Sequence, residues 1–212
     1  MLVGDSFIEA AQIPNDAKLQ ALVAARLDQQ FGKQRADVVA VGLSGTGQAN
    51  QFGLYEAIGR SLSPDLVVLF AVSNDFADNS PLLSAVRNGW SPARPPWFFF
   101  ERTASNEFRP LAPAEDWARF KLTGVDPVAF HAALIQAPGY ASRFGHWRGP
   151  AAADMDTMFY RRDLPPAFAE ALDLTRHAID EWKRIAARDK FQLLIVATPT
   201  LTRGGVDASS EG

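Results

Sequence analysis

Residues 66–72 (Leu-Val-Val-Leu-Phe-Ala-Val) form an apolar run without a single polar interruption. Turn-forming and polar residues bound the run, with Ser63-Pro64-Asp65 before it and Ser73-Asn74-Asp75 after it. An unbroken apolar run of this length is typical of a strand that is covered on both faces, as in a parallel sheet between helices. Residues 191–198 are apolar except for Gln192 and Thr198 and are followed by Pro199, so we expect a second buried strand there.

Segments in which apolar residues recur at helical spacing alternate with the apolar runs. The expected strands cover residues 2–3, 37–41, 66–72 and 191–198, and the expected helices cover about 15–32, 48–62 and 165–188. Such alternation predicts a parallel sheet with helices on both faces. We therefore expect a single α/β domain over residues 1–212, a three-layer α/β/α sandwich with a flavodoxin-like parallel sheet.

Residues 80–165 interrupt this alternation. Proline, tryptophan and phenylalanine cluster between Trp90 and Phe100, and the apolar residues of the segment show no regular period. The segment is too rich in aromatic residues for a disordered linker, so we expect an insertion or lid built of short elements.

Three loops follow the first three expected strands, and ligands bind at the carboxyl ends of the strands in such sheets. Ser6 follows Gly4-Asp5, Gly45 lies in the glycine-rich turn 42–47, and Asn74 follows the strand at 66–72. A serine after Gly-Asp often caps a helix or forms a turn. Together with the N–H of Gly45 and the amide of Asn74, its hydroxyl can also form an acyl-transfer site in which these donors stabilise an oxyanion.

Three short motifs, in this order along the chain, resemble blocks I, II and III of the SGNH (GDSL-type) hydrolases: Gly4-Asp5-Ser6-Phe7, Ser44-Gly45 and Ser73-Asn74-Asp75-Phe76. The resemblance implies that Ser6 is the nucleophile. It implies that the N–H groups of Ser6 and Gly45, with the amide of Asn74, form the oxyanion hole, and that Asp5 is structural. Ser73 departs from the family, which often has glycine there. The resemblance covers residues 1 to about 80 and 166–198, but not the insertion.

A serine nucleophile needs an adjacent base, and the family takes it from an Asp-x-x-His motif in a late loop. This chain has His131, His146 and His177, and none of them lies in such a motif. We expect His177 on a solvated helix face, and His131 in packing or at the surface. His146 is the candidate that lies in a loop, either as the base or as a substrate contact.

The expected sheet is one helix and one strand short of the five-strand core that the resemblance implies. We therefore expect a C-terminally incomplete chain, without the last strand and the catalytic loop, that has little or no esterase activity by itself. Asp78 and Asn79, together with Glu9, lie near the same sheet edge and are further candidate substrate contacts.

The function that the resemblance implies is a serine ester hydrolase with an acyl-enzyme intermediate and with neither metal nor cofactor. Acetylated carbohydrates, lipid esters and thioesters all fit as substrates. One alternative is a non-catalytic binding domain that retains the pocket without the base. Another is nucleotide binding, because residues 42–49 have the glycine spacing of a phosphate loop, although Gln48 and Ala49 replace the lysine and the serine or threonine of that loop.

Composition restricts the partners. The net charge of −3 gives no basic footprint for nucleic acid, and the absence of cysteine excludes disulfides and thiolate ligands. No apolar run approaches the roughly 20 residues of a membrane span. No signal peptide is recognised, and the sequence leaves both the compartment (periplasmic, secreted or cytoplasmic) and the oligomeric state open.

Overall fold

A computed structural model of the chain describes residues 1–33, 35–88, 97–111, 155–156 and 158–198. Its centre is a four-stranded sheet in which every pair of neighbouring strands is parallel. The strands are β1 (Leu2–Gly4), β2 (Ala40–Gly42), β3 (Leu66–Val72) and β6 (Gln192–Thr198), in the order β2-β1-β3-β6. This is the order of the first four strands of flavodoxin-like sheets. The predicted α/β class is therefore confirmed.

The two long apolar runs pair with each other over their whole length. Leu66 lies opposite Gln192 at one end of the β3–β6 ladder, and Val72 lies opposite Thr198 at the other. The predicted limits of β3 are confirmed. The strand β1 extends one residue beyond the predicted 2–3, whereas β2 begins at Ala40 rather than at residue 37.

The helices follow the predicted alternation. They are α1 (Ser6–Glu9), α2 (Leu19–Phe31), α3 (Gln48–Ala57), α4 (Asp75–Asp78), α5 (Pro81–Asn88) and α10 (Pro166–Asp189), with 3₁₀ turns η1 (Asn15–Ala17) and η2 (Gly59–Leu62). The first expected helix, at about 15–32, begins later than expected, because residues 15–17 are not part of α2. Asn15 and Asp16 lie in η1, and Lys18 precedes α2 without a side-chain cap bond.

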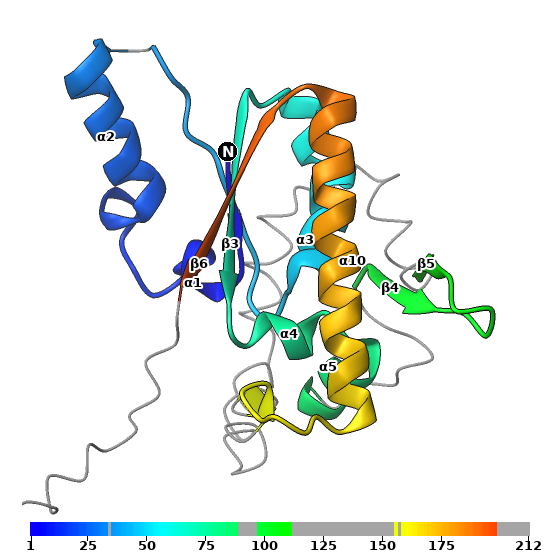
Figure 1. The fold of residues 1–212 in the computed structure, drawn as a ribbon. Coiled ribbons are helices and arrows are strands. Elements are labelled where there is room, and N and C mark those ends of the chain that lie inside the picture. The colour runs from blue at the N-terminus through cyan, green and yellow to red at the C-terminus, as the bar shows by residue number, and fades with distance from the viewer. Residues whose placement is uncertain (34, 89–96, 112–154, 157, 199–212) are drawn as a thin grey trace, which may run out of the picture.

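One face of the sheet carries the core. Helices α3 and α10 lie side by side on that face (Figure 1). Trp182 of α10 and Tyr55 of α3 are almost fully buried, with ring centroids 5.4 Å apart. The indole Nε1–H of Trp182 also donates to the backbone oxygen of Gln48 over 3.0 Å, so the largest buried ring has its polar atom satisfied.

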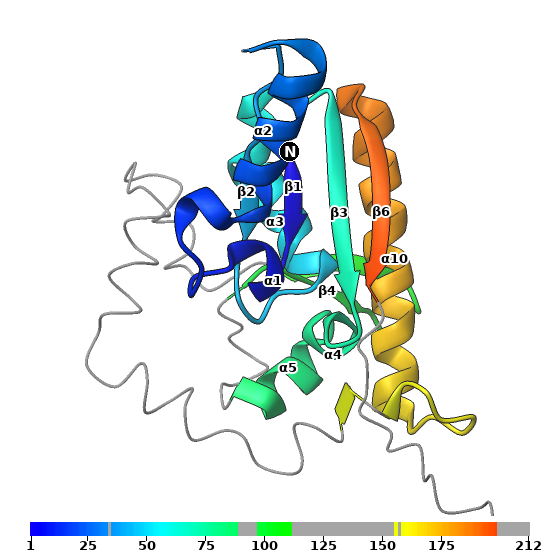
Figure 2. The same cartoon turned by 90° about the vertical axis from the view of Figure 1, so that its left-hand side faces the viewer.

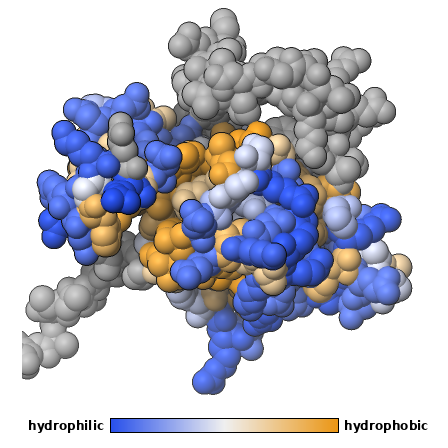
Figure 3. Space-filling model, turned by 90° about the horizontal axis from the view of Figure 1, so that it is seen from above, coloured by the Kyte–Doolittle hydropathy of each residue, from blue (hydrophilic) through white to orange (hydrophobic). Residues whose placement is uncertain are grey.

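The other face of the sheet is less covered than predicted. Helix α2 lies on that side (Figures 1 and 2) but buries none of its residues. Leu194 of β6 is 51% exposed, and Phe31 of α2 is 59% exposed. Figure 3 shows hydrophobic surface on the body of the protein beside α2. Helices thus lie on both sides of the sheet, as expected, but α2 leaves part of the second face exposed in the described structure.

The described parts of the expected insertion contain α5 and a hairpin of β4 (Phe99–Arg102) and β5 (Phe108–Leu111). The hairpin packs its phenylalanines beside α3 and α10. His131 and His146 lie outside the described residues, as does most of the segment expected to form a lid. Within the described part of the chain, no helix is both long and apolar enough to cross a membrane.

Candidate active site

The three loops predicted to carry chemistry leave the same edge of the sheet. Ser6 begins α1 just after β1, Gly45 lies between β2 and α3, and Asn74 lies between β3 and α4. Because β1 is flanked by β2 and β3, these loops are neighbours, and Figure 2 shows α1 and α4 at the same end of the sheet. The chain leaves β1 toward β2 on one side and later adds β3 on the other. Such a switch point is where open α/β sheets bind ligands.

Asp5 joins two of the predicted site residues. Its side chain is almost completely buried, and its Oδ1 accepts the N–H of Phe7 over 3.0 Å as the N-cap of α1. Its Oδ2 accepts the amide of Asn74 over 3.1 Å and faces the hydroxyl of Ser6 at 3.5 Å, a long hydrogen bond. The hydroxyl and the amide therefore lie within two hydrogen-bond lengths of each other, through one shared oxygen.

The backbone N–H groups of Ser6 and Gly45 are available to a ligand. Among the described residues, none accepts a hydrogen bond from either group. Gly45 has a φ of +72°, in the left-handed region that favours glycine, and no heavy atom lies within 4 Å of the position that a Cβ would take. Both residues are half-buried. The loop thus leaves open space beside a backbone donor.

The amide of Asn74 is already engaged. Its Nδ2 donates to Asp5 and also to Oδ2 of Asp78 over 3.3 Å, which uses both N–H groups of the amide. To bind an oxyanion, Asn74 must exchange one of these carboxylate partners for the ligand. The motif gives no sign of this competition, because Asp78 lies one helical turn further along.

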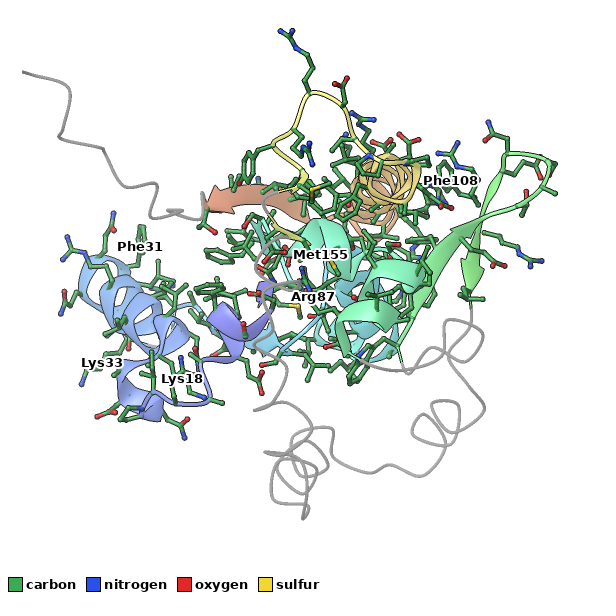
Figure 4. All side chains as sticks on the ribbon, turned by 90° about the horizontal axis from the view of Figure 1, so that it is seen from below. Lys18, Phe31, Lys33, Arg87, Phe108 and Met155 are labelled. Atoms are coloured by element: carbon green, nitrogen blue, oxygen red, sulfur yellow. The ribbon has the colours of Figure 1, made fainter. Side chains whose placement is uncertain are left out.

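Arg87 of α5 holds Asn74 from the other side. Its guanidinium donates to the backbone oxygen of Asn74 over 3.2 Å and to Oδ1 of Asp78 over 3.0 Å, and it pairs with Asp156. Figure 4, seen from this end of the molecule, shows Arg87 within the body of the protein. Burial raises the pKa of Asp78, and the charge of Arg87 opposes that rise. Sequence reasoning did not single out Arg87.

A buried polar network ties these loops to α10. The amide of Asn79 donates to Gln48 over 2.7 Å and to the hydroxyl of Thr175 over 2.9 Å, and its oxygen accepts the N–H of Ala49 over 2.8 Å. A Cβ at Gly47 would lie 2.6 Å from that oxygen, so glycine is needed for this approach.

The candidate substrate contacts Asp78 and Asn79 are both almost fully buried. Their described bonds hold the framework of the loops, and contact with a substrate stays a prediction for each.

Asp75 belongs to the same network. Its Oδ2 accepts the N–H of Val72 over 3.0 Å and the amide of Gln48, whereas its buried Oδ1 has no partner in the described structure. Burial, and then the charge of Asp5, raise the pKa of Asp75 well above its ordinary value. A raised pKa favours the neutral carboxyl of Asp75, which places no negative charge beside Asn74.

His177 does not lie on a solvated face, and that prediction was wrong. Its ring stacks on Phe108 with centroids 4.4 Å apart and an interplanar angle of 12°, and it meets the edge of Phe100 at 4.7 Å. Burial, and then the charge of Arg184, lower its pKa. The hairpin β4–β5 covers the face of α10 that carries His177, although the sequence of α10 is polar on that face. His177 has no described contact with Ser6.

The structure argues against nucleotide binding by a phosphate loop at residues 42–49. Gln48, which replaces the lysine of that loop, is buried and bound within the network, so it cannot reach a phosphate. Over the ranges that the structure describes, no three His, Cys, Asp or Glu side chains are grouped so as to hold a metal ion.

Comparisons with family models, with curated proteins and with solved structures give no match to this chain. The interpretation of the site therefore depends on its residues and their geometry.

Proposed function

We propose that this chain is a serine ester hydrolase of the SGNH type, with Ser6 as nucleophile and an oxyanion hole formed by Ser6, Gly45 and Asn74. One observation carries the proposal. The hydroxyl of Ser6 and the amide of Asn74 meet on one oxygen of Asp5 at the switch point of the sheet. The two further donors that this chemistry needs, the N–H groups of Ser6 and Gly45, have no acceptor among the described residues.

In the proposed reaction the Oγ of Ser6 attacks an ester carbonyl and its proton passes to a base. The carbonyl oxygen becomes an oxyanion and accepts hydrogen bonds from the two N–H groups and from Asn74, which releases Asp5 or Asp78. The alcohol leaves with a proton, and water then cleaves the acyl-enzyme to the acid and free Ser6. These steps use side chains and backbone alone. Acetylated carbohydrates and lipid esters are the proposed substrates.

The base is the part of the mechanism that the described residues do not supply. His177 is held between Phe100 and Phe108 and has no contact with Ser6. His146, outside the described residues, stays a candidate. This observation favours a second function, a non-catalytic binding domain that retains the Ser6 site without an imidazole.

A fluorophosphonate tests the proposal without assuming a base. The reagent phosphonylates an activated serine, and at about pH 10 hydroxide can take the proton that an imidazole takes at pH 7. We expect Ser6 to react faster than every other serine at pH 10, as mapped by peptide mass spectrometry. Ser6→Ala should remove the adduct. Ser61→Ala, at an exposed serine on η2, is the matched control and should retain it.

The two functions separate at pH 7. An enzyme with its base in this chain labels at pH 7 and hydrolyses acetyl and longer acyl esters, and a pocket without a base labels only at high pH. A folded protein in which Ser6 reacts no faster than Ser61 at either pH would contradict both the nucleophile and the oxyanion hole.

A further inference from the structure

Helix α1 has a second acidic residue at its other end. Asp5 caps the start of this single turn, and Glu9 ends it. The Oε2 of Glu9 accepts the backbone N–H of Ser44 over 2.8 Å and also accepts the hydroxyl of Ser44. Ser44 is the residue immediately before Gly45, so one carboxylate oxygen joins the helix of Ser6 to the loop that carries the second backbone donor.

The backbone at this junction is also closely packed. A Cβ at Gly42 would overlap the backbone of Glu9 and Ile8, so the end of β2 lies directly against α1. The N–H of Leu43 donates to the oxygen of Gly4 over 3.3 Å and extends the β1–β2 ladder by one bond. The relative position of α1 and the first part of the loop is therefore fixed up to Leu43.

Beyond Leu43, the hydroxyl of Thr46 donates to the backbone oxygen of Leu43 over 2.6 Å and closes a turn around Ser44 and Gly45. Gly45 lacks a Cβ and has open space around it, so its own conformation does little to fix the direction of its N–H. The two bonds to Glu9 fix both the N–H and the hydroxyl of Ser44. With Ser44 held by Glu9 on one side of Gly45 and Thr46 bound to Leu43 on the other, the Ser44–Gly45 peptide and its N–H are restricted relative to Ser6.

We infer that Glu9 is a positioning residue that directs the N–H of Gly45 toward the oxyanion formed on Ser6. The inference rests on the proposed function, and it gives Glu9 a role other than contact with the substrate. An oxyanion donor contributes only when it points at the place where the charge develops. A shift of about 1 Å in such a group can cost about 10²-fold in rate.

The test compares Glu9→Ala with Glu9→Gln. The amide oxygen of glutamine can accept both bonds from Ser44, whereas alanine accepts neither. We expect Glu9→Ala to slow the phosphonylation of Ser6 by about 10- to 10²-fold through its maximal rate, with half-saturation unchanged. Glu9→Gln should restore most of the rate. Glu107→Ala is the matched control, since Glu107 accepts a serine hydroxyl on the exposed hairpin, and it should not change the rate.

A second experiment measures the order of the Gly45 amide directly. The ¹H–¹⁵N heteronuclear NOE of the Gly45 amide reports its order on the picosecond to nanosecond timescale. We expect this NOE to fall in Glu9→Ala and to be retained in Glu9→Gln and Glu107→Ala, while amides of β3 keep their values in all three variants.

The outcomes separate the two claims. A Glu9→Ala protein that is phosphonylated at the wild-type rate overturns the positioning role and leaves the proposed function intact. A slower rate with an unchanged NOE at Gly45 also overturns it, because the loss then has another cause. If Ser6 of the wild-type protein does not react at either pH, the proposed function fails, and the role of Glu9 in it fails too.

Discussion

Replacing Asp75 by asparagine should make the protein more stable at neutral pH. Asp75 is almost fully buried, and its pKa is raised well above the ordinary value of 3.8 by burial and by Asp5. Its Oδ2 accepts hydrogen bonds from Val72 and Gln48, and its Oδ1 has no partner in the described structure. Asparagine has the shape of a protonated aspartic acid, so its oxygen can accept the same two bonds. Asp75→Asn should thus behave like the protonated wild-type protein at every pH.

The size of the effect follows from the linkage between protons and folding. Above about pH 3.8 the unfolded chain releases the proton of Asp75, whereas the folded chain retains it up to its raised pKa. The folded state binds more protons, so the free energy of unfolding of the wild type falls as the pH rises. The slope is about 1.4 kcal/mol per pH unit for one proton. The stability contributed by the protonated form is complete below pH 3.8 and is lost once the pH passes the folded-state pKa.

Urea unfolding followed by circular dichroism at several pH values between 4 and 7 measures this difference. We expect equal stabilities near pH 4 and an advantage of Asp75→Asn that grows by about 1.4 kcal/mol per pH unit until the folded-state pKa is reached. The pKa of Asp78 is also raised, and its charge adds to the rise at Asp75, so the difference between the two curves reports Asp75 together with this coupling. Two parallel curves, or a variant that is less stable at every pH, would show that the folded protein does not retain the proton of Asp75 above pH 4.

Three further predictions concern the buried network and the phosphate-loop alternative. Gly47→Ala places a Cβ 2.6 Å from the Asn79 oxygen, so it should lower the free energy of unfolding, measured in urea, by about 1–3 kcal/mol. A loss below roughly 0.5 kcal/mol, the effect of an ordinary surface substitution, would contradict the close approach. Asn79→Ala leaves the N–H of Ala49 and the side-chain oxygen of Gln48 without their partner, so it should lower the free energy of unfolding by about 2–5 kcal/mol. Hydrogen exchange of the Ala49 amide should accelerate. Unchanged exchange would contradict the network. ATP with Mg²⁺ should leave the melting temperature unchanged because Gln48 is buried, and a saturable rise would reopen nucleotide binding.

The sheet was predictable because each strand is marked by a local pattern, a run of apolar residues between turn-forming residues. The apolar run at 66–72 fixed β3 to the residue, and the alternation with helical segments indicated parallel pairing. The final helix was predicted at 165–188 and found at Pro166–Asp189. The loops after β1, β2 and β3 meet at one edge because parallel strands carry their ends there. This follows from topology without knowledge of any side-chain contact.

The rest depends on contacts between residues far apart in the sequence. Asn79 and Thr175 are 96 residues apart, and nothing in either neighbourhood marks them as hydrogen-bonded partners. Polar residues near a predicted site were therefore interpreted as possible substrate contacts, whereas Asp78 and Asn79 are buried. His177 has charged neighbours on its own helix, but a hairpin from the insertion covers it. The sequence of a helix predicts which of its faces is polar, but it does not show which distant segment packs on that face.

The central claim is that Asn74 stabilises the oxyanion formed on Ser6. The most direct measurement is the phosphonylation rate of Ser6 at about pH 10 in Asn74→Ala, with Asn88→Ala of α5 as a matched control whose amide donates to Ser84. Both variants are first checked for a wild-type circular dichroism spectrum. We expect Asn74→Ala to slow the reaction by about 10²–10³-fold, as loss of one oxyanion donor does, and Asn88→Ala to leave the rate unchanged. A folded Asn74→Ala protein that reacts within about twofold of the wild-type rate would contradict the claim.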